Sequence, residues 1–261
     1  MSDHLRLTHQ DGVAILTIER PDRRNALDGP LWTGIGAAAK KLAQNPPKAL
    51  IVTGAGGHFS SGMDLKPDNP LLQRLLPAMA AQDEAVFTAL ITELKGAVDA
   101  LTLLPCPVIA AIEGACAGGG LEVALACDLR VAGETAFFSL PEARVGMMPD
   151  VGGTVRLSRL IGRARAAELI LTNERIDART AHHFGLINRI ATPGQALAEA
   201  LRLAVQTQSS APTATKEILQ LLRSPEPTFA AETAAGVRVL CSGEAVEGVS
   251  SFFEKRPPRW S

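Results

Sequence analysis

The segment EGACAGGGLEVALACD, Glu113–Asp128, places three consecutive glycines between an apolar run and a helical pattern. The run before it, PVIAAI at Pro107–Ile112, is typical of a buried strand. Glycines at such a junction permit a positive φ and let a ligand approach the backbone closely. The first N–H groups of the following helix have no partner within the helix, so they could hold an oxygen that becomes negatively charged. The same glycines could instead serve only to pack the strand against the helix.

Outward from this segment, short apolar runs bounded by turn residues predict further strands. They lie at Val13–Ile18, Leu50–Thr53, Leu129–Ala132 and Ala136–Ser139. Because these runs are apolar nearly throughout, we expect a sheet that is covered on both faces, as parallel sheets are. The alternation of such runs with helical patterns predicts an α/β fold.

Apolar residues recur every three or four positions from Phe87 to Leu104, which predicts a long amphipathic helix. Shorter helices are predicted at Arg163–Thr172 and Asp177–Phe184. From Gly194 onward the pattern is helical throughout, in the segments Gln195–Gln208, Pro212–Arg223, Phe229–Leu240 and Gly243–Lys255. We therefore divide the chain into an α/β core, residues 1–192, and a helical C-terminal region, residues 193–261. Pro67–Met79, with its three prolines and four leucines, is interpreted as a mobile loop beside the site.

Composition narrows the class of protein. The 261 residues are 46% hydrophobic, which is enough for a folded core, and 26 Lys and Arg nearly balance 27 Asp and Glu. Nucleic-acid and membrane-surface proteins usually carry a basic excess, so neither partner is predicted. The four cysteines include no C-x-x-C pair and are typical of buried residues in a reducing compartment.

The sequence contains neither a secretory signal nor a membrane-spanning pattern. Met1–Asp11 lacks the apolar run of a secretory signal, and Pro107–Cys127, the most apolar stretch, is interrupted by Glu113 and Glu122. We expect a soluble, cytoplasmic protein.

Several catalytic devices are missing from the sequence. It has no G-x-x-x-x-G-K-[ST] phosphate loop and no G-x-S-x-G nucleophile elbow. The five histidines form no i, i+4 metal pair, so no metal site is predicted, and the lack of tyrosine excludes phenolic acid–base catalysis.

Two glutamates are candidate proton-transfer groups. Glu122 lies two residues after the glycine triplet among apolar neighbours, where burial raises the pKa of a carboxyl group toward neutrality. Glu142, in SLPEARVG, follows twenty residues later. The alternative for Glu122 is a structural carboxylate that is paired internally or complements a helix dipole.

Six motifs, taken in order, resemble the enoyl-CoA hydratase/isomerase (crotonase) superfamily. They are ERPDRRNAL at Glu19–Leu27, FSSGMDLK at Phe59–Lys66, GGGLEVALACDLRVA at Gly118–Ala132, PEARVG at Pro141–Gly146, GLINRI at Gly185–Ile190 and FFEKRPP at Phe252–Pro258. The resemblance runs nearly from end to end. It implies a crotonase-like spiral of ββα units with a helical C-terminal region.

The resemblance also implies a reaction and the groups that perform it. The backbone N–H groups of Met63 and Gly119 would form an oxyanion hole for a thioester enolate. Glu122 and Glu142 would hold a water against the 2,3-double bond of an enoyl-CoA, giving hydration to a 3-hydroxyacyl-CoA. The sequence does not assign the acid and the base between these two glutamates, because coupled carboxyl groups titrate as a pair.

Substrate-binding positions follow from the same resemblance. Arg24 and Ala26 match positions near the CoA nucleotide, and Asp64, Leu65 and Lys66 would line the thioester and pantetheine side with Met63. Phe252 and Lys255 match positions that reach the adenine-phosphate end, in some relatives from a neighbouring subunit. CoA would enter as part of the acyl-CoA substrate, with no metal or redox cofactor.

Asp150, in MMPDVGGT, is compatible with either a catalytic or a structural role. A dienoyl-CoA isomerase branch uses an Asp there together with the Pro-Glu glutamate, but it has Asp where this chain has Glu122. Asp150 could instead cap a helix near Val151–Leu160, and we favour that structural role. The dehalogenase branch needs a further His, and no His occurs between His58 and His182.

The interpretation is therefore an enoyl-CoA hydratase that assembles as a homotrimer or hexamer through its C-terminal helices. Two alternatives remain. One is a double-bond isomerase that uses Glu142 and Asp150; the other is a non-catalytic acyl-CoA-binding protein that kept the fold.

Overall fold

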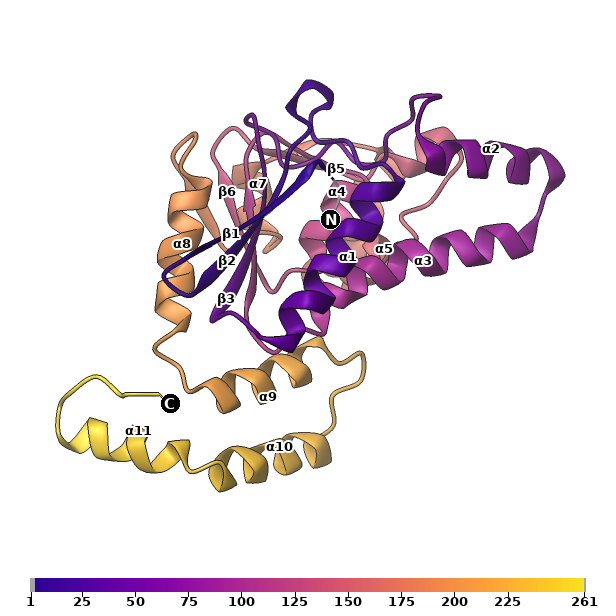
Figure 1. The fold of residues 1–261 in the computed structure, drawn as a ribbon. Coiled ribbons are helices and arrows are strands. Elements are labelled where there is room, and N and C mark those ends of the chain that lie inside the picture. Colours follow the sequence, from indigo (N-terminus) through magenta and orange to yellow (C-terminus); the bar gives the residue numbers. More distant parts are fainter. Residues whose placement is uncertain (1–2, 261) are drawn as a thin grey trace.

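The computed structural model describes residues 3–260, and its centre is a six-stranded sheet with strand order β1-β2-β3-β4-β6-β9 (Figure 1). β1 runs antiparallel to β2, and the other neighbours are parallel. The strands span Leu5–Gln10 (β1), Val13–Ile18 (β2), Ala49–Gly54 (β3), Val108–Ile112 (β4), Leu129–Gly133 (β6) and Arg189–Ala191 (β9). A smaller sheet joins Ala115–Ala117 (β5), Phe137–Ser139 (β7) and Ile176–Asp177 (β8).

Helices cover the larger sheet and extend beyond it. In chain order they are Gly29–Gln44 (α1), Pro70–Ala81 (α2), Glu84–Thr102 (α3), Gly119–Leu125 (α4), Gly153–Ile161 (α5), Arg163–Thr172 (α6), Ala178–His183 (α7), Ala196–Thr207 (α8), Pro212–Arg223 (α9), Phe229–Cys241 (α10) and Glu244–Phe253 (α11). Two short 3-10 helices lie at Pro21–Arg23 (η1) and Glu142–Val145 (η2).

The sheet is buried on both faces, as the apolar strands predicted. Leu16, Val52 and Ala110 lie in the core that includes residues of α1 and α3. Their neighbours along the strands, such as Ile15 and Ile51, lie in a second core with Ala200 and Leu203 of α8. Since successive side chains of a strand point to opposite faces, this alternation requires two covering layers.

Most expected elements are confirmed, but the interpretation of Pro67–Met79 as a mobile loop is wrong. α2 begins at Pro70, and the side chain of Asn69 caps it by accepting a hydrogen bond from the N–H of Leu71. Proline is favoured at the first position of a helix, where its missing N–H is not needed. Pro70 is therefore a start signal, and Leu71 is buried against the core.

The C-terminal region is helical, as expected, and its helices have different surroundings. α8 contacts β3, β4 and β6 and so covers one face of the sheet. α10 and α11 lie beyond α9, away from the sheet (Figure 1). The division at residue 192 stays a prediction.

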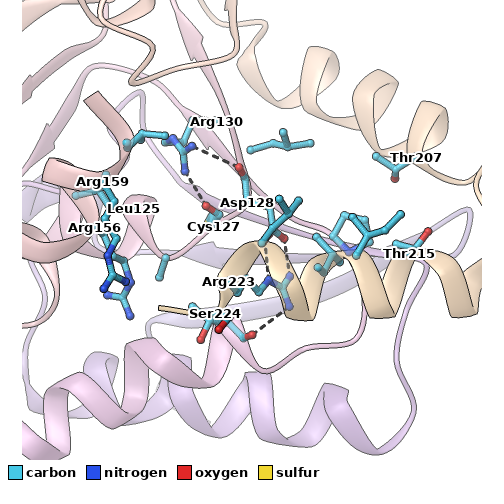
Figure 2. A pocket seen from close by; sticks show the side chains of 18 of the residues that line it. Leu125, Cys127, Asp128, Arg130, Arg156, Arg159, Thr207, Thr215, Arg223 and Ser224 are labelled. Atoms are coloured by element: carbon cyan, nitrogen blue, oxygen red, sulfur yellow. Dashed lines mark hydrogen bonds and ion pairs between the residues drawn. The ribbon is translucent and has the colours of Figure 1, made fainter. Parts of the chain in front are cut away.

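An ion pair docks α9 on the core. The guanidinium of Arg223 donates to both carboxylate oxygens of Asp128, with N–O distances of 2.7 and 2.6 Å (Figure 2). It also donates to the carbonyl of Cys106 at 3.0 Å. A half-buried bidentate pair with further hydrogen bonds fixes both position and orientation.

In the part of the chain that the structure describes, no helix is long and apolar enough to cross a membrane.

The contact between α1 and α3 predicts opposite effects for two alanine substitutions. A Cβ atom on Gly36 of α1 would lie 2.7 Å from Cα of Ala97, whereas one on Gly96 of α3 would meet no atom within 4 Å. Gly36→Ala should lower the free energy of unfolding by roughly 1–3 kcal/mol through overpacking. Gly96→Ala should raise it by about 0.5–1 kcal/mol, because alanine favours the helix. Urea unfolding of both variants checks this, and equal effects would contradict the packing described.

Candidate active site

Two chain segments that are far apart in the sequence lie side by side at the site. Ser60 forms a parallel bridge with Cys116, and the N–H of Ala117 donates to the carbonyl of Ser60 at 3.0 Å. Gly62 and Gly119 follow these residues, and a Cβ atom on Gly62 would lie 3.2 Å from the nitrogen of Gly119. The loop after β3 is thereby held against the start of α4.

The backbone nitrogen of Met63 lies close to Gly119, since a Cβ atom on Gly119 would be 3.8 Å from it. Leu27 bonds to the residues on either side of Met63, donating to Gly62 and accepting from Asp64. In such a bridge the central residue points its own N–H away from its partner, so the N–H of Met63 points away from Leu27. The N–H of Gly119 is in the first turn of α4, where no intrahelical acceptor exists. Within residues 3–260, neither N–H donates to a protein acceptor.

Buried Asn25 holds the surrounding loops in place. Its side-chain oxygen accepts from the N–H of Arg20 at 2.8 Å, and its amide nitrogen donates to the carbonyls of Ala55 and His58. Its own carbonyl accepts from the hydroxyl of Ser60 at 2.8 Å. One side chain thus connects the loop after β2 with the loop after β3, which explains an asparagine in the first motif.

Glu122 lies on α4, three residues after Gly119, and is 3% exposed. Its Oε1 accepts a hydrogen bond from the N–H of Gly153, the first residue of α5, at 2.8 Å. Burial raises the pKa of Glu122 to about 7, and the negative charges of Glu142 and Asp150 add to that effect. The Gly153 N–H acts in the opposite direction. The group can therefore exchange a proton near neutral pH.

Glu142 approaches the same place from η2. Its Oε1 lies 3.0 Å from the position that a Cβ atom on Gly118 would take. Its Oε2 is buried and has no hydrogen-bond partner among the described residues. Burial, together with the charge of Asp150, raises the pKa of the Glu142 carboxyl. An unpartnered buried carboxyl oxygen beside the glycine triplet is available to a ligand or a water.

Asp150 does not cap the next helix, so the capping role that we favoured is wrong. α5 begins at Gly153, its cap residue Gly152 makes no side-chain bond, and the helix terminus is bound by Glu122 instead. Asp150 is close enough to raise the pKa of both glutamates, and burial raises its own pKa as well. Three carboxyl groups therefore interact at this site.

A recess of about 340 Å³ opens beside Met63. It is lined by Asp22, Arg23, Arg24, Ala26, Ser61, Met63, Asp64, Leu65 and Lys66. The structure thus brings together the six positions that the sequence predicted near the thioester, pantetheine and nucleotide. Arg24 and Lys66 are exposed, so their charges are accessible to a phosphate.

The carboxylate of Asp64 is occupied by the protein itself. Its Oδ2 accepts from Arg20 and Arg23, both at 2.9 Å, and its Oδ1 accepts from the N–H of Lys66 at 3.1 Å. Burial opposes ionisation, but these three donors outweigh it and lower the pKa of Asp64. Asp64 therefore ties the wall of the recess together.

Phe252 and Lys255 lie elsewhere in the chain. Phe252 is 79% exposed near the end of α11, and α11 contacts α10. Among the described residues that line the recess, neither is present. The structure of one chain does not bring them to the site.

Sequence reasoning missed two participants. Gly153 contributes only its backbone N–H, which binds Glu122. In the sequence, only the two consecutive glycines shortly after Asp150 pointed to this position. Trp32 of α1 packs against Gly119, where a Cβ atom would lie 2.6 Å from its ring atom Cζ2. No motif pointed to Trp32, because the contact depends on how α1 packs against α4.

A second cavity, of about 530 Å³, lies between α9 and the core (Figure 2). Two of the arginines that line it make internal bonds: Arg223 binds Asp128, and Arg130 donates to the carbonyls of Leu186 and Cys127. These groups hold α9 and the β6 region in place.

Comparisons with known proteins show which family the chain resembles. The sequence profile described as enoyl-CoA hydratase/isomerase matches residues 8–261. Enoyl-CoA hydratase EchA19 of Mycobacterium tuberculosis is 36% identical over 253 residues, which cover 94% of this chain and 92% of the relative. Carnitinyl-CoA dehydratase of Salmonella arizonae is 34% identical over 271 residues, 100% of this chain and 99% of the relative. The crystal structure of an enoyl-CoA hydratase from Polaromonas sp. JS666 has a TM-score of 0.88 and 35% identity, and covers 98% and 99% of the two chains.

The mixed α/β fold, with its glycine-rich strand-to-helix junction, is that of the crotonase class. The chain belongs to the enoyl-CoA hydratase/isomerase family.

The raised pKa of Glu122 predicts a pH-dependent cost to folding. Its pKa is about 7 in the folded protein against an ordinary value of 4.5, so the folded state binds the extra proton. The free energy of unfolding should then fall as pH rises from about 4.5 to about 7, by on the order of 3 kcal/mol. Glu122→Gln keeps an acceptor for the Gly153 N–H and removes the charge.

Urea unfolding of parent and Glu122→Gln at pH 5 and pH 8 tests this. The variant should gain stability over the parent at pH 8 and match it at pH 5. Equal stability at both values would show that Glu122 has an ordinary pKa.

Proposed function

We propose that the protein is an enoyl-CoA hydratase, which adds water reversibly across the 2,3-double bond of a trans-2-enoyl-CoA to give a 3-hydroxyacyl-CoA. One observation carries the proposal: buried Glu122 and half-buried Glu142, whose Oε2 is buried and unpaired, lie beside the glycine triplet. The N–H groups of Met63 and Gly119 at that place have no acceptor among the described residues. The names of two similar proteins, enoyl-CoA hydratase and carnitinyl-CoA dehydratase, support this reaction class.

The oxyanion hole supplies the electrostatic part of the proposed mechanism. The thioester oxygen binds between the N–H groups of Met63 and Gly119, and these donors stabilise the negative charge that develops in the enolate. Preorganised donors of this kind are each worth roughly 100- to 1000-fold in rate. The helix dipole of α4 acts in the same direction at Gly119.

The two glutamates supply the proton transfers. The Glu122 carboxylate removes a proton from water as the oxygen bonds to C3, and protonated Glu142 donates a proton to C2. The pKa of Glu122 near 7 and the raised pKa of Glu142 allow one group to be ionised while the other is protonated. Because the two carboxyl groups titrate as a coupled pair, the reactive form is the one in which the pair holds a single proton.

A double-bond isomerase is the second candidate, and the placement of Asp150 favours it. Asp150 interacts with both glutamates, so Glu142 and Asp150 could move a proton between two carbons of the acyl chain. Isomerisation leaves the product mass unchanged, whereas hydration adds one water, so mass spectrometry separates the two reactions.

CoA enters the proposed reaction as part of the substrate. Acid, base and oxyanion donors are all side chains or amides of the protein, so the mechanism uses no resident cofactor. The exposed charges of Arg24 and Lys66 would contact the CoA phosphates at the recess. The cytoplasmic location stays a prediction.

We also propose that the protein assembles as a homotrimer or hexamer through its C-terminal helices. α10 and α11 expose a series of large apolar side chains: Phe229, Val237, Leu240, Val246, Val249, Phe252 and Phe253. Large exposed apolar side chains that gather on neighbouring helices favour an interface. In such an assembly a second copy could bring Phe252 and Lys255 to the substrate.

The catalytic proposal predicts the activity of two glutamine variants. Glu122→Gln and Glu142→Gln should each lower kcat for crotonyl-CoA hydration at least ~100-fold, because each removes one proton-transfer group. Glu168→Gln, an exposed change on α6, is the matched control and should leave kcat unchanged. The product of the parent should be heavier than the substrate by one water. A product of unchanged mass would support the isomerase, and full activity in Glu122→Gln would refute its role.

The assembly proposal predicts a change of mass in solution. Light scattering after size exclusion should give three or six chains for the parent, and Leu240→Asp should shift the protein toward monomer by placing a charge in the interface. Leu103→Asp is the control: Leu103 is exposed on the surface of the α/β part of the chain, so this change should leave the mass unchanged. A monomeric parent would contradict the assembly.

A further inference from the structure

Arg20 is a buried cation that the proposed mechanism does not use. Its side chain is 8% exposed, and the residue directly precedes η1. Its guanidinium pairs with two carboxylates: Nη2 lies 2.9 Å from Oδ2 of Asp64, and Nη1 lies 3.2 Å from Oδ2 of Asp28. Nη1 also donates to the carbonyl of Ala26 at 2.8 Å. A buried guanidinium that binds two chain segments at once fixes one segment against the other.

Arg20 binds both sides of the bridge between Leu27 and Met63. On one side it contacts the residues before and after Leu27, and on the other it contacts Asp64, which follows Met63. Backbone hydrogen bonds of 2.8 and 2.9 Å join Leu27 to the residues before and after Met63. The guanidinium therefore spans the two segments at the place where the bridge joins them.

The position of the Met63 N–H depends on this bridge. Both bonds of the bridge use the neighbours of Met63, so its own N–H points away from Leu27. A Cβ atom on Gly119 would lie 3.8 Å from the nitrogen of Met63. A shift of the bridge therefore moves this N–H relative to Gly119. Misplacement of a catalytic group by about 1 Å can cost on the order of 100-fold in rate.

We propose that Arg20 is a positioning residue for the oxyanion hole, whose guanidinium fixes the N–H of Met63 by clamping Asp64 to the segment around Leu27. This inference rests on the proposed oxyanion role of the Met63 amide and adds the side chain that holds that amide in place. Arg20 is not among the described residues that line the recess, so it acts through its neighbours in the protein.

The other arginine that binds Asp64 does not make the same connection. Arg23 also donates to Oδ2 of Asp64 at 2.9 Å, but its second ion pair is with Asp68, which is 63% exposed. Within residues 3–260, the guanidinium of Arg23 makes no bond to the segment around Leu27. The clamp between the two segments therefore depends on Arg20.

The test keeps the charge at position 20 and removes the planar fork, whose two terminal nitrogens bind different segments. In Arg20→Lys, kcat for crotonyl-CoA hydration should fall roughly tenfold or more while KM changes less than about threefold, because the amide acts on charge that develops in the transition state. Arg189→Lys is the matched control, since Arg189 forks between Glu199 and Gln206. It should lower the urea midpoint and leave kcat unchanged.

Asp28→Asn covers the case in which Arg20→Lys does not fold. Oδ1 of Asp28 caps α1 by accepting from the N–H of Leu31, whereas its Oδ2 faces Arg20. Asparagine caps helices as well as aspartate does, so α1 is retained and the contact with Arg20 is lost. In this variant kcat should fall about threefold or more, again with KM nearly unchanged.

A spectroscopic readout separates this inference from the hydratase proposal. The chain has five methionines, so labelling with ¹⁵N-methionine gives few amide signals, and Met63→Leu assigns the one from Met63. In the ligand-free protein, Arg20→Lys and Asp28→Asn should each shift the Met63 signal, and Arg189→Lys should leave it in place. Calorimetric binding of acetoacetyl-CoA, which needs no turnover, should weaken in the first two variants only.

Each combination of results decides one proposal. If the parent fails to hydrate crotonyl-CoA but the Met63 signal moves and binding weakens, the hydratase proposal fails and the role of Arg20 stands. If the parent is active, an unmoved Met63 signal in both variants would overturn that role. A rise in KM at unchanged kcat would overturn it as well, because Arg20 would then serve substrate binding and not the amide.

Discussion

The absence of Cβ atoms at Gly118–Gly120 is the constraint on which the site depends. A Cβ on Gly118 would meet a Glu142 oxygen at 3.0 Å, and one on Gly119 would meet the Trp32 ring at 2.6 Å. One on Gly120 would lie 2.7 Å from Cβ of Ser60. Three different elements thus pack directly on one turn of backbone. Any side chain there would separate the Met63 amide from the start of α4, and the paired donors would be lost.

The same close packing determines the pKa of Glu122. With water displaced, Glu122 loses most of its solvation, and it retains one strong donor, the N–H of Gly153 at the start of α5. That donor orients the carboxyl group and moderates the rise in its pKa, while Glu142 and Asp150 push the pKa upward. The balance leaves the pKa of Glu122 at about 7, which lets it exchange a proton at neutral pH. As a consequence, ionisation of Glu122 destabilises the folded protein.

The sequence predicted the fold class, most strands and helices, and most of the residues that the structure brings together near the glycine triplet and the recess, because those depend on local pattern and motif order. It failed where a contact between distant elements decides the outcome. Asn69 and Pro70 begin a helix whose burial against the core could not be seen in the residues of that segment alone. Aspartate is a common N-cap residue, but at the start of α5 the side chain of Glu122, and not that of Asp150, accepts the backbone hydrogen bond. Trp32 had no signal, since only tertiary packing brings α1 to Gly119.

In the proposed mechanism one oxygen is held by the two amides while both glutamates face the same carbon–carbon bond. A crystal structure of the protein with acetoacetyl-CoA tests it most directly. The account predicts a thioester oxygen about 2.7–3.1 Å from the nitrogens of both Met63 and Gly119. It also predicts the carboxyl groups of Glu122 and Glu142 on one side of the acyl C2–C3 bond. A thioester bound away from these amides, or either carboxyl group turned away from C2 and C3, would contradict the account.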